Sequence, residues 1–161
     1  TRAYLRSHDR VGVVSVGGQQ GTMFIPLVDV VHYKSDPDVK APVSFDAFVN
    51  KQLEGLCGSD GSTVSVTCTN PTATKFTTPA GLVGEQVALT LIEKDMKTGV
   101  AKTLSYAPIY VFNTTASTTP GQPVRYEGVF IYPTFTSFLL VGTTSPAFVE
   151  GIADTLTIKA H

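Results

Sequence analysis

Apolar and polar side chains alternate along most of this chain, in short runs that glycine and proline separate. Alternation with a period of two is typical of strands that bury one face, and Thr and Val fit such a pleated surface. Because proline cannot donate to a β-ladder, we expect Pro26 at a sheet edge or a bulge and expect Pro108 to disturb its strand. The pattern predicts strands over residues 10–16, 22–33, 63–69, 85–93, 100–112, 124–132, 134–141 and 152–160.

Residues 44–56 are the exception, because their apolar side chains recur with the period of a helix and form one stripe. Ser44 can cap this helix, and Asp46 suits the positive end of its dipole. Gly55 or Gly58 is expected to end it. We expect the helix to cover one open end or face of the β core. The stripe consists of Phe45, Phe48, Val49, Leu53 and Leu56.

The connections complete an all-β pattern. Residues 95–99 predict the turn of a hairpin, and the polar residues 113–123 predict a long surface loop. No internal repeat or linker divides the chain, so we predict a single domain over residues 1–161, with residues 1–9 as an extended N-terminal arm. The predicted fold is an antiparallel β-sandwich or barrel, jelly-roll-like or Greek-key-like, with one short amphipathic helix.

The charge composition argues against several classes of partner. The 161 residues include 12 Lys and Arg against 13 Asp and Glu, for a formal net charge of −1, and only 16% of the residues are charged. Such a balance gives no field that would hold nucleic acid or an anionic membrane strongly. The chain has no apolar run long enough to insert into a membrane and no export-signal pattern at its start.

Two sequence features indicate an oxidising compartment. Cys57 and Cys68 bracket a short loop, and a disulfide between them would stabilise the fold by about 3 kcal/mol through the entropy of the unfolded chain. The alternative is a pair of buried free thiols. Asn113 begins the acceptor motif Asn113-Thr114-Thr115 for N-glycosylation, for which a plain polar turn is the alternative.

Groups that carry catalysis or hold metals are scarce. The chain has three histidines, and the one that suits a hydrolytic site is His32, which would need Asp29 and a nearby Ser or Thr as partners. Asp36 and Asp38 lie in an oxygen-rich loop, as do the residues around Asp60, but neither loop has the spacing of a calcium site. We therefore predict no catalytic residues, no metal and no cofactor.

Two groups of residues are candidates for recognition. Strand alternation places Tyr126 and Tyr132 on one face, with Gly128 opening space between them for stacking against a sugar or a protein. Tyr110, on the preceding strand, is a further candidate. The N-terminal arginines Arg2, Arg6 and Arg10 are expected to lie in an arm that contacts a neighbouring subunit.

A neutral, Thr- and Ser-rich β domain without an acid–base set is suited to packing against copies of itself. We therefore predict a structural, self-assembling surface protein: a virion coat (capsid protein), spike or decoration domain, or an extracellular fibre subunit. The second hypothesis is a secreted adhesion module that binds a host-surface glycan or protein. The third is a hydrolase centred on His32.

Overall fold

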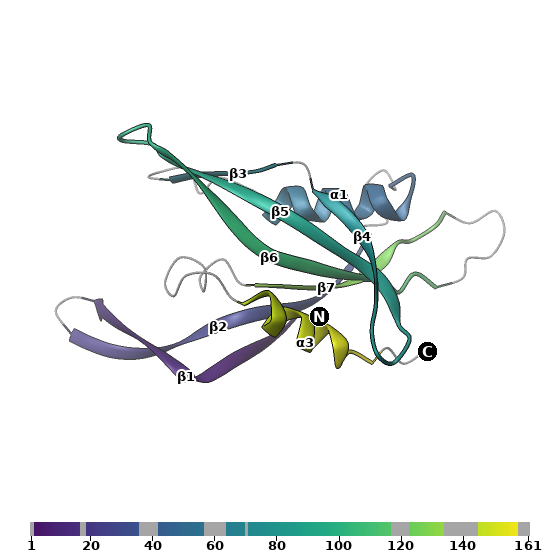
Figure 1. Ribbon diagram of the computed structural model, residues 1–161, viewed down its shortest axis with the longest axis horizontal. Coiled ribbons are helices and arrows are strands. Elements are labelled where there is room, and N and C mark those ends of the chain that lie inside the picture. Colours follow the sequence, from purple (N-terminus) through teal and green to yellow (C-terminus); the bar gives the residue numbers. More distant parts are fainter. Residues whose placement is uncertain are drawn as a thin grey trace.

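The computed structural model of the chain describes residues 2–16, 19–35, 42–56, 64–69, 71–116, 123–133 and 145–157. These residues form seven strands and two helices (Figure 1). The strands are β1 (Arg2–Val16), β2 (Gln19–Lys34), β3 (Val64–Cys68), β4 (Thr72–Thr77), β5 (Val83–Asp95), β6 (Ala101–Asn113) and β7 (Glu127–Pro133). The helices are α1 (Phe45–Leu56) and α3 (Pro146–Asp154).

All seven strands belong to one curled, antiparallel half-barrel sheet, which confirms the predicted all-β class. The strand order is β1-β2-β7-β6-β5-β3, and β4 also pairs with β5. Strand β5 is long enough to hold two neighbours on one side. Its first half pairs with β4, from Val83 to Ala88, and its second half pairs with β3, from Leu91 to Asp95.

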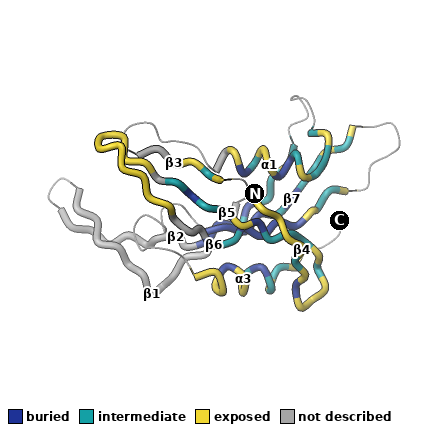
Figure 2. Tube along the Cα trace, turned by 45° about the horizontal axis from the view of Figure 1, so that its top comes forward, coloured by how far each residue is buried: buried dark blue, intermediate teal, exposed yellow. Residues whose placement is uncertain are grey.

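A helix covers each face of the sheet, so the core has two layers of apolar contacts (Figure 2). We call these the α1 face and the α3 face. Side chains alternate between them along each strand, as strand geometry requires. The buried residues of the α1 face include Val31, Phe48, Leu53, Ile109, Val111 and Phe130. Those of the α3 face include Val28, Tyr110, Phe112, Ile131, Val149 and Ala153.

Helix α1 forms where its sequence pattern predicts it. The Ser44 hydroxyl accepts a hydrogen bond from the Ala47 backbone N–H at 3.1 Å, which confirms the predicted cap. Phe48, Val49 and Leu53 from the predicted apolar stripe are buried against the sheet. The helix runs through Gly55 and ends at Leu56, so Gly55 does not terminate it.

The prolines and the hairpin turn also fall as expected. The pairing of β1 with β2 shifts register at Pro26, and the pairing of β5 with β6 shifts beside Pro108, so each proline lies at a bulge. At the hairpin tip the Asp95 carboxylate accepts hydrogen bonds from the backbone N–H groups of Lys97 and Thr98, both at 2.8 Å. These bonds lower the pKa of Asp95, and Gly99 completes the turn with a φ of 73°.

Two predictions about secondary structure are wrong. Residues 152–157, part of a predicted strand, lie in helix α3 and the turn that ends it, because Val149, Ile152 and Ala153 face the sheet at helical spacing. Strand β4 is missing from the predicted strands, because its side chains are mostly exposed and show no apolar alternation. The predicted strand over residues 134–141 lies outside the described residues.

Candidate functional site

A groove follows the flank of helix α1, where the helix overhangs the edge of the sheet made by β3, β4 and β5. It consists of three adjoining hollows of about 490, 220 and 390 Å³. The first two share Asp46, Ala73 and Glu85, and the last two share Asn50, Leu53 and Pro71. We call this continuous depression the α1 groove.

The wall of the α1 groove is a polar stripe of the helix. Asp46, Asn50 and Glu54 are spaced four residues apart, which places them on one side of α1, and all three are exposed. The apolar stripe packs on the sheet, so this polar stripe faces the β4 side. The floor is formed by Ala73, Glu85, Val87 and Leu89.

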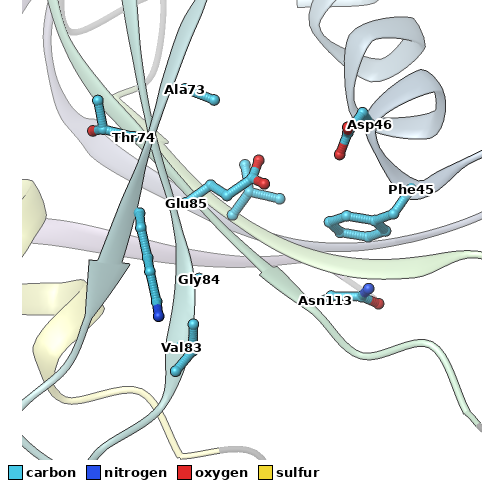
Figure 3. Close-up of a pocket in the computed structure, with 10 residues that line it drawn as sticks. Phe45, Asp46, Ala73, Thr74, Val83, Gly84, Glu85 and Asn113 are labelled. Atoms are coloured by element: carbon cyan, nitrogen blue, oxygen red, sulfur yellow. The ribbon is translucent and has the colours of Figure 1, made fainter.

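Two carboxylates approach the same space at one end of the α1 groove. Glu85 rises from β5 and Asp46 points down from α1, with Phe45 and Asn113 beside them (Figure 3). Desolvation raises the pKa of the half-buried Glu85, and the negative charge of Asp46 raises it further. Lys75, which pairs with Glu85 in the strand register, is the cation among the lining residues. The groove therefore carries more negative than positive charge.

The raised pKa of Glu85 predicts a pH-dependent effect of Glu85→Gln. The native state binds the Glu85 proton more tightly than the unfolded state does. Ionised Glu85 therefore lowers the free energy of unfolding at pH values above its raised pKa. It has no such effect at pH values below the pKa that Glu85 has in the unfolded state. We expect the variant to be more stable than the parent at pH 7. Thermal unfolding from pH 3.5 to 8 should show this difference disappearing at low pH, whereas a constant difference would contradict the electrostatic cause.

The tyrosines predicted for stacking lie on the predicted faces but under helices. Tyr132 is 4% exposed, and Tyr126 stacks on Phe48 of α1 with ring centroids 6.5 Å apart. The space at Gly128 is also filled, because a Cβ there would lie 3.3 Å from the Phe45 ring. The prediction of an open stacking platform is therefore wrong, since α1 covers that face.

Tyr110 is fully buried on the α3 face. Gln86 donates a hydrogen bond to its hydroxyl at 3.1 Å, and the hydroxyl donates to Glu150 of α3 at 3.4 Å. Burial raises the pKa of Tyr110, and the Glu150 carboxylate raises it further against the opposing effect of Gln86. This side chain links α3 to the sheet and does not present a binding surface.

His32 lies on the α3 face, near the end of β2. Its Nε2 atom is 3.2 Å from the Thr114 hydroxyl and 3.2 Å from one carboxylate oxygen of Glu127, whose other oxygen Lys34 contacts at 3.0 Å. A catalytic relay needs one ring nitrogen toward the hydroxyl and the other toward the carboxylate. Here both partners meet the same nitrogen, and Asp29 lies on the opposite face, so this is the geometry of a surface polar cluster.

Comparison with known proteins gives no relative. No family model matches the sequence, and no curated protein or solved structure is significantly similar to it. Function is therefore inferred from the groove, the edges of the sheet and the distribution of charge.

The described residues contain neither a cluster suited to a metal ion nor a helix suited to a membrane span. Among those residues, no group of three or more His, Cys, Asp or Glu side chains is placed to hold a metal ion. No helix there is long and apolar enough to cross a membrane. Asp36, Asp38 and Asp60, the acidic residues considered for calcium, lie outside the described residues.

The glycosylation motif, the cysteines and the N-terminal arginines are the other predicted features. Asn113 is exposed at the end of β6, and its side-chain oxygen accepts a hydrogen bond from the Thr115 N–H at 2.9 Å. Cys68 is half-buried at the end of β3 and lines the α1 groove, and no free cysteine is found in the described part of the chain. Its predicted disulfide partner, Cys57, lies outside the described residues. The arginines Arg2, Arg6 and Arg10 lie in β1, which pairs with β2 of the same chain.

The α1 groove could not be predicted from the sequence. The spacing of Asp46, Asn50 and Glu54 was visible as a polar helix stripe. What the stripe faces depends on how β4 and β5 pair, and that pairing has no local signal.

Proposed function

We propose that this protein is a structural surface protein that assembles with copies of itself through the edges of its sheet. The observation that carries the proposal is the open sheet. Among the described strands, β1 pairs only with β2, and β3 and β4 pair only with β5. An edge strand leaves a row of backbone N–H and C=O groups available for pairing with another chain.

The composition of β4 supports this role. Five of its six residues are exposed, and Lys75 is its one charged residue. Natural proteins that limit edge pairing use short strands, charges, prolines and bulges on their edges. Strand β4 is short and carries Lys75, but it has no proline and pairs with β5 without a bulge, so its outer edge is regular. A polar, regular edge strand can join a second sheet without exposing apolar surface in the free subunit.

The proposal includes a setting outside the cell, either on a virion or in an extracellular fibre. The predicted Cys57–Cys68 disulfide and the Asn113 motif suit an oxidising, secretory route. The low fraction of charged residues suits a surface that packs against copies of itself more than one that binds a polyanion.

The alternative is a secreted binding module. The α1 groove is the observation that favours it, because a continuous depression of this length can hold an extended peptide or glycan. A module of this kind would act as a monomer and would bind a selected glycan or protein in an array.

Particle size tests the proposed function directly. We expect purified protein to form discrete rings, shells or filaments as its concentration is raised, visible by light scattering and negative-stain microscopy. A strict monomer over the whole soluble range would contradict assembly. Selective binding by that monomer in a glycan array would support the alternative.

A further inference from the structure

We propose that the free edge of β1 in one copy pairs with the free edge of β4 in the next copy, which brings the basic first half of β1 to the acidic α1 groove beside β4. This inference rests on the proposed function and identifies the two surfaces that meet. The occupant of the α1 groove is therefore a second copy of this chain.

The backbone of β4 supplies the first half of the contact. Its pairing with β5 runs without interruption from Thr72 opposite Ala88 to Thr77 opposite Val83. Among the described strands, nothing pairs with its other side. Addition of a strand at such an edge forms regular main-chain hydrogen bonds, and side chains of the added strand supply the specificity.

Charge complementarity identifies β1 as the added strand. The lining of the α1 groove includes the carboxylates of Asp46, Glu54 and Glu85 against the single ammonium of Lys75. The first nine residues of β1 carry three arginines and one aspartate. A strand laid beside β4 would run along the open side of this acidic groove.

The spacing of the charges also agrees. Asp46 and Glu54 are eight residues apart on α1, a separation of about 12 Å along the helix axis. Arg2 and Arg6 are four residues apart on β1, a separation of about 13 Å along an extended strand. Opposite charges therefore recur at similar intervals along the two segments. A guanidinium group can bind a carboxylate through two parallel hydrogen bonds, which also fixes the register.

This contact repeats. Each copy has one β1 edge and one β4 edge, and they lie at opposite ends of the strand order. A contact between two different surfaces builds rings when the rotation between copies closes and filaments when it does not. The pairing therefore predicts an assembly larger than a dimer.

Charge reversal tests the inference. We expect Arg2→Glu with Arg6→Glu in one chain, and Asp46→Lys with Glu54→Lys in another, each to raise the concentration needed for half-assembly by at least about tenfold. An equimolar mixture of the two variants should assemble within about threefold of the parent concentration, because each altered surface then meets its complement. Assembly is measured by light scattering, and folding by circular dichroism.

A matched control separates this contact from a general effect of net charge. Lys97→Glu with Lys102→Glu makes the same change in net charge as the arm variant, at exposed positions of the β5–β6 hairpin, and should leave assembly unchanged. If both groove and arm variants are folded and assemble like the parent, or if the folded pair does not assemble when mixed, the inference is overturned while the proposed function stands. If the parent itself stays monomeric, the proposed function and the inference both fail.

Discussion

Replacing Phe48 with alanine is expected to lower the free energy of unfolding by about 3–5 kcal/mol. Phe48 is 0% exposed and is the ring through which α1 meets the sheet. It stacks on Tyr126 and meets Phe130 edge-on, with ring centroids 6.5 and 6.1 Å apart. Truncation leaves a cavity that the surrounding rings cannot fill without moving. Urea unfolding followed by circular dichroism measures the loss.

Phe148 provides the control for this experiment. It is also a helical phenylalanine, but it lies on α3 with 45% of its surface exposed. Phe148→Ala should change the unfolding free energy by no more than about 0.5–1 kcal/mol, since little apolar area is returned to water. Equal effects of the two substitutions would contradict the packing of α1 on the sheet.

Gly84→Ala is the second large effect, and it acts by crowding. A Cβ at Gly84 would lie 2.6 Å from Cδ1 of the buried Phe112 ring and 2.6 Å from the Val111 carbonyl oxygen. The carbonyl belongs to the neighbouring strand, so relief requires β5 and β6 to separate. We expect a loss of about 3 kcal/mol or more in the free energy of unfolding.

Gly151→Ala should have the opposite sign. Nothing lies within 4 Å of a Cβ at Gly151, which is exposed in the middle of α3. Alanine is the better helix former by up to about 1 kcal/mol, so this variant should unfold at a higher urea concentration than the parent. If Gly84→Ala leaves the free energy of unfolding unchanged while Gly151→Ala raises it, the Phe112 ring does not crowd β5 at Gly84.

The elements that could be predicted from the sequence are those with a complete local signal. Helix α1 has a stripe of apolar residues and a capping serine, so its start was predicted within one residue. The β5–β6 hairpin has an aspartate-to-glycine turn between two apolar strands. Both proline bulges follow from the missing N–H of that residue.

The two errors in secondary structure have different physical causes. Helix α3 is only nine residues long and contains Gly151, so its local preference for helix is weak and its packing on the sheet determines its conformation. Strand β4 is exposed on both sides apart from Phe76, and its conformation comes from pairing with β5. Neither cause is visible in a short window of sequence.

The candidate site also combines features with a local sequence signal and features that depend on tertiary packing. Alternation placed Tyr126 and Tyr132 on one face of the sheet, as the structure has them. Alternation carries no information about which helix covers that face, so their burial under α1 could not be predicted. The α1 groove depends on α1, β4 and β5 together, which only the tertiary structure combines.

One border of the sheet is formed by two short strands, β3 and β4, which lie one after the other along β5. The first of these strands ends at Cys68 and the second begins at Thr72, so the longest uninterrupted strand on that border is the six residues of β4. Short borders resist indiscriminate aggregation, because a foreign chain gains few main-chain bonds from them. A subunit built this way can join its own copies and still reject strands of the wrong length or charge.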